Sequence, residues 1–112
     1  MKFFKKLSRS VKGRVAIITG AGSGMGEATA KVFAAEGVKV IATDIKLDEV
    51  ERVSEEIQSA NGECLPLLLD VTDKSAIEEC IKKCVKNFNG LDFVINNAGI
   101  SSVTAVDDEN YE

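Results

Sequence analysis

The stretch Thr19-Gly20-Ala21-Gly22-Ser23-Gly24-Met25-Gly26 holds four glycines within seven residues. It lies between a short apolar run and a segment with helical periodicity. Glycine reaches positive φ at little cost and lets the backbone come close to a ligand, whereas a simple turn needs only one or two glycines. A helix that starts here turns its free N–H groups and the positive end of its dipole toward the loop. The stretch therefore predicts a strand, a phosphate-binding loop and a helix, in that order.

The spacing of these glycines distinguishes between known types of phosphate loop. A G-x-G-x-x-G pattern fails from Gly20 and from Gly22, because Met25 and Glu27 occupy its last position. A G-x-x-x-G-x-G pattern fits Gly20, Gly24 and Gly26. No Gly-Lys followed by Ser or Thr is present, so the loop is not a P-loop.

Strand-like and helix-like segments alternate on both sides of this loop. The sequence predicts strands at 14–19, 38–43, 63–69 and 91–96, and helices at 24–36, 48–60 and 73–88. This β-α-β-α-β-α-β order predicts an α/β fold with a Rossmann-type parallel sheet covered by helices on both faces. Right-handed crossovers favour the strand order 3-2-1-4, which gives a partial Rossmann fold. Pro66 cannot donate a hydrogen bond, so the third strand is expected at an edge.

Three details of the helices follow from the residue pattern. The first helix places five residues at helical spacing: Met25, Ala28, Thr29, Val32 and Phe33. Asp48 and Glu51 have the spacing of a capping box, which predicts that the second helix starts at Asp48. The third helix is expected to start from Thr72 or Asp73.

The composition excludes several classes of site. The 112 residues contain no histidine, which excludes His–Zn sites and nucleophiles activated by histidine. The chain has no apolar run long enough to span a membrane. Three cysteines without a CxxC motif argue against a disulfide framework or a metal site and favour a cytoplasmic protein. Cys80 and Cys84 are one helical turn apart and are expected to face the core.

Charge is divided unevenly along the chain. Residues 1–14 hold six bases and no acid, whereas residues 15–112 hold eight bases and 18 acids, a net charge of −10. The acidic body argues against nucleic acid as a partner. Phe3, Phe4 and Leu7 among the bases suggest contact of residues 1–14 with an anionic membrane, but a frayed extension is the favoured interpretation. We therefore expect a basic extension over 1–10 and a partial Rossmann domain over 11–112.

Asp44 is a second candidate binding residue. It ends the second predicted strand, 18 residues after Gly26. An acidic side chain at this place accepts hydrogen bonds from the adenosine ribose hydroxyls and repels a 2′-phosphate. A solvated aspartate at a strand end is the alternative. Lys46 lies close in sequence and would reduce the bias against NADP.

With two further motifs, these residues resemble the short-chain dehydrogenase/reductase family, which has a Rossmann fold. Residues 19–26 are similar to its TGxxxGxG loop, with Met25 where isoleucine is usual. Asp44 resembles the acidic residue of members that prefer NAD. Asp70-Val71 resembles the pair that receives the adenine ring, and Asn96-Asn97-Ala98-Gly99 matches the NNAG motif. The resemblance covers residues 11–112.

The resemblance implies an NAD(P)-dependent oxidoreductase that transfers hydride between a nicotinamide cofactor and an alcohol or carbonyl substrate. NAD is the expected cofactor and NADP the less favoured one. The implied cofactor-binding residues are Gly20, Ser23, Gly24, Met25, Gly26, Asp44, Ile45, Asp70, Val71, Asn97, Ala98 and Gly99.

The family's catalytic serine, tyrosine and lysine are not matched in this sequence. Tyr111 is the only tyrosine and no YxxxK occurs, while Ser101 and Ser102 follow NNAG too closely to be the family's serine. The expectation is the N-terminal, cofactor-binding half of an oxidoreductase, with an open fourth strand, marginal stability and possible homo-oligomer formation. A non-catalytic dinucleotide-binding module, or half of a two-chain assembly, is the alternative. Substrate would bind only if the other half were supplied.

Overall fold

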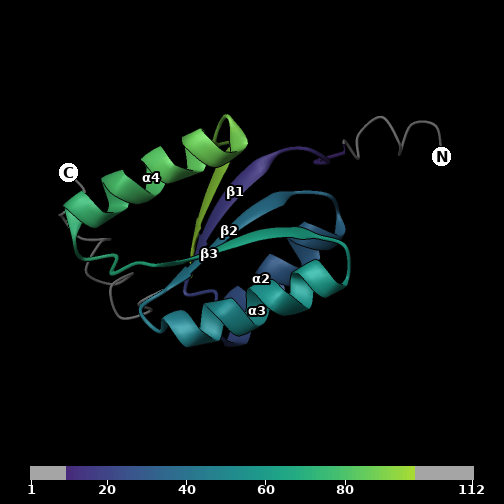
Figure 1. Cartoon of the computed structure of the whole chain (residues 1–112), viewed down its shortest axis with the longest axis horizontal. Helices are drawn as coiled ribbons and strands as arrows, with labels where there is room; N and C mark the ends of the chain where they lie inside the picture. Colours follow the sequence, from purple (N-terminus) through teal and green to yellow (C-terminus); the bar gives the residue numbers. More distant parts are fainter. Residues whose placement is uncertain (1–9, 98–112) are drawn as a thin grey trace.

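Strands and helices alternate along the chain in the computed structural model, which describes residues 10–97 (Figure 1). Each predicted element is present, with ends that differ from the prediction by at most two residues. The strands are β1 (Val15–Thr19), β2 (Lys39–Asp44), β3 (Glu63–Leu68) and β4 (Phe93–Asn96), and the helices are α2 (Gly24–Ala35), α3 (Leu47–Ser59) and α4 (Lys74–Phe88).

The four strands form one parallel sheet in the order β3-β2-β1-β4, as predicted. Pro66 lies on β3, which is an edge strand of this sheet, and its partner on β2 is Ala42. An edge strand tolerates proline because only one of its sides needs donors for the ladder. The sequence and the sheet therefore agree on a partial Rossmann fold.

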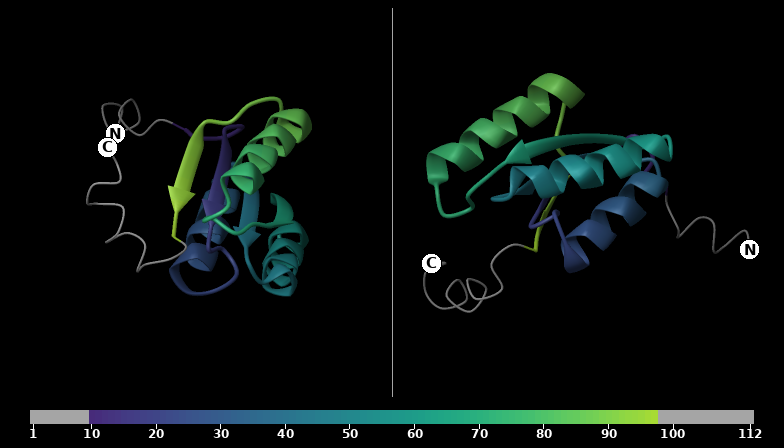
Figure 2. Two further views of the ribbon diagram at one scale, coloured as in Figure 1. Left: turned by 90° about the vertical axis from the view of Figure 1, so that its left-hand side faces the viewer. Right: turned by 60° about the horizontal axis from the view of Figure 1, so that its bottom comes forward.

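Helices cover both faces of the sheet (Figure 2). One face packs against α2 and α3, and the other against α4. Val40 and Ile41 on β2 point to opposite faces and are both fully buried. The first core contains Ala16, Ile18, Ala30, Ala34, Val38, Val40, Val50, Val53 and Ile57, and the second contains Val15, Ile17, Ile41, Leu69, Cys80 and Cys84.

The buried face of α2 is made of small residues. The helix itself is confirmed, but Met25 and Val32, two of the apolar residues that revealed it, are 74% and 60% exposed. The buried residues are Gly26, Ala30 and Ala34. Small side chains let the helix axis come close to the sheet, and this close approach places the start of α2 against the glycine loop.

The predicted capping box of the second helix is wrong. Helix α3 begins at Leu47 with Lys46 at its N-cap, and no side chain caps it. Asp44 explains the earlier start, because its Oδ1 accepts the Lys46 amide at 3.2 Å and turns the chain into the helix. Asp48 lies in the first turn. The cap expected for α4 is confirmed, since the Asp73 side chain accepts the Ala76 amide.

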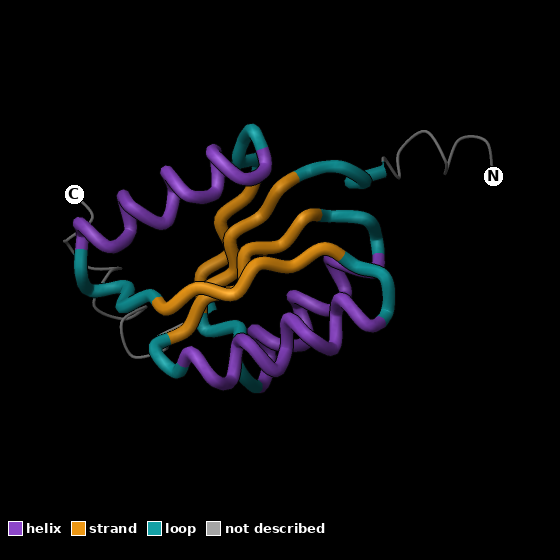
Figure 3. Tube along the Cα trace, in the orientation of Figure 1, coloured by secondary structure: helices purple, strands orange, loops and turns teal. Residues whose placement is uncertain are grey.

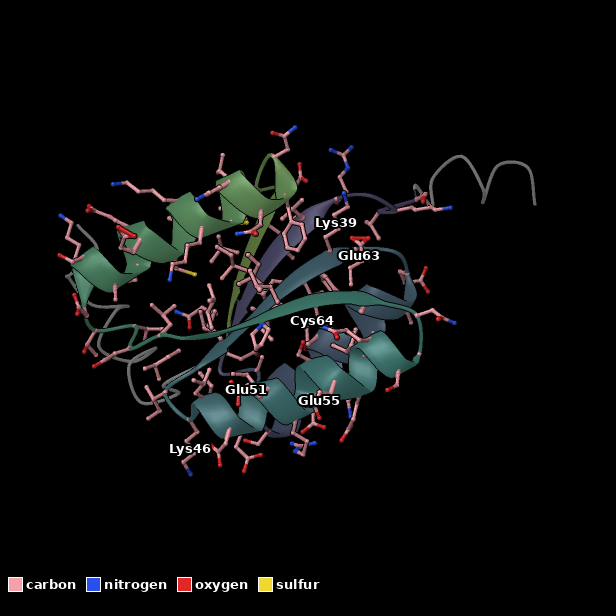
Figure 4. All side chains as sticks on the ribbon, viewed as in Figure 1. Lys39, Lys46, Glu51, Glu55, Glu63 and Cys64 are labelled. Carbon is pink, nitrogen blue, oxygen red and sulfur yellow. The ribbon has the colours of Figure 1, made fainter. Side chains whose placement is uncertain are left out.

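All three cysteines are buried free thiols, and the core positions predicted for Cys80 and Cys84 are confirmed. Cys64, labelled in Figure 4, lies on β3 and packs into the core shared with α3. Burial is the main cause that raises the pKa of the Cys84 thiol to about 11, so this thiol stays protonated at neutral pH. No helix within residues 10–97 is both long and apolar enough to cross a membrane.

Candidate functional site

A cavity of about 490 Å³ lies where the strands end. The loops after β2 and β3 leave the sheet at the same end, as parallel strands require (Figure 3). The cavity is lined by Gly20, Ser23, Met25, Gly26, Asp44, Ile45, Leu69, Asp70, Val71, Thr72 and Asn97. The structure thus brings together the predicted binding residues within the described range, apart from Gly24, which starts α2 next to them. Ala98 and Gly99 lie outside the described residues.

Two lining residues, Leu69 and Thr72, were missed by the sequence analysis. They flank Asp70-Val71 directly, so their place at the end of the third strand was the signal that would have identified them. Thr72 holds Asp70, whose Oδ1 accepts the Thr72 amide at 2.9 Å and the Thr72 hydroxyl at 2.6 Å. These hydrogen bonds hold the pKa of Asp70 below its usual value. Within residues 10–97, no three acidic or cysteine side chains gather as a metal site.

Three glycines of the loop, Gly20, Gly24 and Gly26, occupy positions that other residues would fill only at a cost. Gly20 and Gly24 have φ of 64° and 58°, a region that glycine adopts at low cost. A Cβ built on Gly26 would lie 2.0 Å from the Gly20 carbonyl oxygen. Helix α2 can therefore lie this close to the loop only if residue 26 is glycine. This explains the last glycine of the predicted pattern.

The start of α2 is not capped by a side chain. Ser23 is the N-cap residue, and its side chain makes no capping hydrogen bond. The first helical hydrogen bond in this turn runs from the Glu27 amide to the Ser23 carbonyl at 3.2 Å. The amides of Gly24, Met25 and Gly26 come before it, and such first-turn amides have no partner within a helix. The dipole adds partial positive charge at this point, so the helix start favours an anion.

Asp44 links the glycine loop to the end of β2. Its Oδ2 accepts a hydrogen bond from the Gly22 amide at 2.9 Å. The amide of the preceding residue, Ala21, donates to the Thr43 carbonyl, also at 2.9 Å. The carboxylate is half-buried at the cavity wall. The Lys46 side chain extends outward from the start of α3 (Figure 4).

The ends of β1 and β4 are joined by side chains. The Thr19 hydroxyl donates to Asn96 Oδ1 at 2.7 Å and accepts the Asn97 amide at 3.1 Å. Asn97 Nδ2 is buried, and within residues 10–97 it has no hydrogen-bond partner. A buried amide N–H₂ without an acceptor is costly, so this group is suited to an acceptor from a bound molecule.

A group of five charged side chains, which we call the α2–α3 ion network, lies beside the loop. Arg52 Nη2 lies 3.0 Å from Glu27 and 3.2 Å from Glu49, and Arg52 Nη1 lies 3.1 Å from Glu56. Lys31 also pairs with Glu27, at 2.7 Å, and with Glu56. The sequence analysis missed this network. The i, i+3 and i, i+4 spacing of Glu49, Arg52 and Glu56 was a partial signal, but the contact with α2 depends on the tertiary structure.

The network makes stability depend on pH in the acid range. Hydrogen bonds from Arg52 and then Lys31 lower the pKa of Glu27 from its usual 4.5 to about 2. A lowered pKa means that the Glu27 carboxylate stabilises the fold above pH 4.5, and that this contribution is lost as the pH falls through 2. We expect Glu27→Gln to cost about 1 kcal/mol at pH 7, because solvent screens partly exposed pairs.

Urea unfolding between pH 7 and pH 2 measures this effect. The difference between wild type and Glu27→Gln should shrink as the pH falls through this range. Glu55→Gln is the control, since Glu55 lies on exposed α3 surface, labelled in Figure 4, and has no ion pair in the described structure. A constant difference at every pH would contradict the role of Glu27.

Comparisons with known proteins point to one family. Residues 14–112 match the family described as short chain dehydrogenase. A 3-oxoacyl-(acyl-carrier-protein) reductase FabG of Thermotoga maritima is 41% identical over 91 residues, which are 81% of this chain and 37% of that protein. A 2,5-dichloro-2,5-cyclohexadiene-1,4-diol dehydrogenase LinX of Sphingobium indicum is 39% identical, over 95% of this chain and 42% of that protein.

A solved structure agrees with these matches. The crystal structure of a hydroxysteroid dehydrogenase from Escherichia coli superposes with a TM-score of 0.78 at 34% identity, and the match covers 80% of this chain and 38% of that one. The chain thus spans about two fifths of the length of the relatives that it matches. Its fold, its sequence and the residues at its sheet edge lead to the same conclusion: this chain belongs to the short-chain dehydrogenase family.

Proposed function

We propose that this chain binds NAD at the cavity at the carboxyl edge of its sheet, and that it is the cofactor-binding part of an NAD-dependent oxidoreductase. One observation carries the proposal: the start of α2, which favours an anion, and the carboxylate of Asp44 lie at the same cavity. Ser23 and Gly26 at the start of α2 line the cavity, and so does Asp44. A dinucleotide offers a pyrophosphate for the first and ribose hydroxyls for the second.

The residues present fit such a cofactor in three respects. The uncapped start of α2 would hold the pyrophosphate with the amides of Gly24, Met25 and Gly26. Asp70 and Val71 form part of the wall expected to receive the adenine. Asn97 Nδ2, buried without a partner in the described structure, would donate to an oxygen of the cofactor.

The preference for NAD over NADP is attributed to Asp44. Its carboxylate is fixed by the amides of Gly22 and Lys46, so it cannot easily turn away from a bound ribose. A 2′-phosphate next to this carboxylate would place two negative charges together, which is unfavourable. The Lys46 side chain extends outward at the start of α3, and its effect on this bias stays a prediction.

The chemistry of the whole protein is proposed from its relatives. A bound nicotinamide supplies or accepts a hydride. Residues 10–97 would hold and orient this cofactor. The exchange of a proton with the substrate is assigned to the serine, tyrosine and lysine that the family uses, which this sequence does not match. The substrate class is an alcohol or carbonyl compound.

A fluorescence titration of the 112-residue chain with NADH and with NADPH tests the proposal. The chain has no tryptophan, which simplifies the reading of nicotinamide emission. We expect saturable NADH binding with a Kd at least tenfold lower than that of NADPH. Circular dichroism confirms folding in the same sample. A folded chain that does not bind NADH, or that binds NADPH more tightly, would refute the proposed cofactor.

A further inference from the structure

Arg52 connects α3 to the glycine loop. Besides its ion pairs, its Nη2 donates to the Gly22 carbonyl oxygen at 3.1 Å. Gly22 is buried, and a Cβ added there would lie 2.8 Å from Glu49 Cβ and 2.9 Å from Asp44 Oδ2. The loop is therefore held on its outer side by α3 and by the end of β2.

Both polar groups of Gly22 are fixed by side chains from different elements. Its amide donates to Asp44 at the end of β2, and its carbonyl accepts from Arg52 on α3. In a trans peptide the C=O and the next N–H point in opposite directions. The described chain has no cis peptide bond. Because the Gly22 carbonyl points toward Arg52 on α3, the N–H of Ser23 in the same peptide group points away from α3. Ser23 is the N-cap of α2 and lines the candidate cofactor cavity.

Three carboxylates orient the guanidinium itself. Glu27, Glu49 and Glu56 surround it, with N–O distances of 3.0 to 3.2 Å. Glu27 belongs to the first turn of α2, so one arginine contacts the loop and also the helix that follows it. Arginine suits this place because its planar fork donates to several acceptors in fixed directions, which lysine cannot do.

We propose that Arg52 is a positioning residue for the cofactor: it fixes the peptide between Gly22 and Ser23 and thereby orients the loop amides toward the dinucleotide. The inference rests on the proposed NAD binding. It assigns a role in affinity to a side chain that lies outside the cavity lining. Because the role is indirect, loss of Arg52 should weaken binding of the cofactor without removing any group that would contact it.

Lys31 provides a matched control for the network. It pairs with Glu27 and Glu56, as Arg52 does, but among the described residues it forms no hydrogen bond with the glycine loop. Arg52→Gln and Lys31→Gln each remove one partly exposed cation from the same network. Both variants should lower thermal stability by similar amounts, and only Arg52→Gln should alter the loop. Arg52→Lys keeps the positive charge but loses the forked guanidinium group. Its affinity for NADH should lie between those of wild type and Arg52→Gln.

The experiment measures three quantities on the 112-residue chain: the melting temperature, the Kd for NADH, and the hydrogen exchange of the segment 20–26 without ligand. For Arg52→Gln we expect about tenfold weaker NADH binding, the effect of one hydrogen bond from a charged donor. We also expect faster exchange in 20–26. For Lys31→Gln we expect a Kd within twofold of wild type and unchanged exchange in 20–26.

The outcomes separate this inference from the proposed function. Equal weakening of NADH binding by the two variants would show that the network is only structural and would overturn the role of Arg52. If the wild-type chain does not bind NADH, the proposed function fails. Hydrogen exchange alone then decides whether Arg52 positions the loop. Faster exchange in 20–26 for Arg52→Gln alone would support the positioning role, and equal exchange in both variants would overturn it.

Discussion

Gly26→Ala is expected to remove dinucleotide binding and to destabilise the fold by about 3 kcal/mol, the upper end of the usual cost of overpacking. The added methyl group would lie 2.0 Å from the Gly20 carbonyl oxygen, 2.6 Å from the Gly20 carbonyl carbon and 3.1 Å from Ala21 Cα. All three atoms belong to the backbone, so no side chain can rotate to relieve the contact. Helix α2 must move away from the loop, and its amides then no longer face the cavity.

The measurements are the Kd for NADH and the free energy of unfolding in urea. Gly90→Ala is a neutral control, because within residues 10–97 no heavy atom other than those of its chain neighbours lies within 4 Å of an added Cβ. Gly13→Ala controls for a loss of stability. Within the described residues no atom beyond its chain neighbours lies within 4 Å of an added Cβ, but its φ of +83° costs an alanine about 1 kcal/mol or more. It should lose stability and keep its affinity for NADH. Gly26→Ala with NADH affinity within threefold of wild type would contradict the assignment of the loop.

Asp44→Ala is expected to weaken NADH binding by about 10- to 100-fold and to reduce the preference for NADH over NADPH at least tenfold. A hydrogen bond to a charged group contributes about 1.5–3 kcal/mol, and 1.4 kcal/mol corresponds to a factor of ten. The substitution removes the carboxylate that would hold the ribose hydroxyls. It also leaves the Gly22 amide without its acceptor. NADPH should lose less, because repulsion of its 2′-phosphate disappears in the same variant.

Titrations with both nucleotides measure the ratio of the two Kd values. Asp48→Ala removes the same charge from the first turn of α3, four residues from Asp44, and should leave the ratio unchanged. If Asp44→Ala and Asp48→Ala shift the ratio equally, selectivity depends on net charge near α3 and not on the position of Asp44. An unchanged ratio in Asp44→Ala would remove Asp44 from cofactor selection altogether.

Patterns local in the sequence predicted most of the fold. Buried parallel strands appear as continuous apolar runs, and the glycine loop marks the junction of β1 and α2. The strand order followed from the handedness of crossovers and from Pro66, which the sheet places on an edge. Asp70 and Asn97 come at the carboxyl ends of predicted parallel strands, which end on the same side of a sheet, and both residues line one cavity.

Features that depend on contact between elements were not predictable. The buried side of α2 is Gly26, Ala30 and Ala34, because close packing on the sheet selects small residues over large apolar ones. The contact of Arg52 with the Gly22 carbonyl depends on the relative position of α3 and the loop, which no spacing in the sequence encodes. The start of α3 was misplaced by one residue, because Asp44 turns the chain earlier than the capping pattern implied.

The pairing of β4 with β1 has a consequence for the order of folding. Strands β1 and β2 pair over a separation of 24 residues, as do β2 and β3, whereas Ala16 and Phe93 pair over 77. Closing the longer loop costs about 1 kcal/mol more in chain entropy and slows the formation of non-local contacts. We therefore expect the unit from β1 to β3 to form first and β4 to dock last. In that order Thr19 would meet Asn96 and Asn97 only in the last step, so the edge that carries the candidate site would be completed late, and a bound dinucleotide would favour the docked strand.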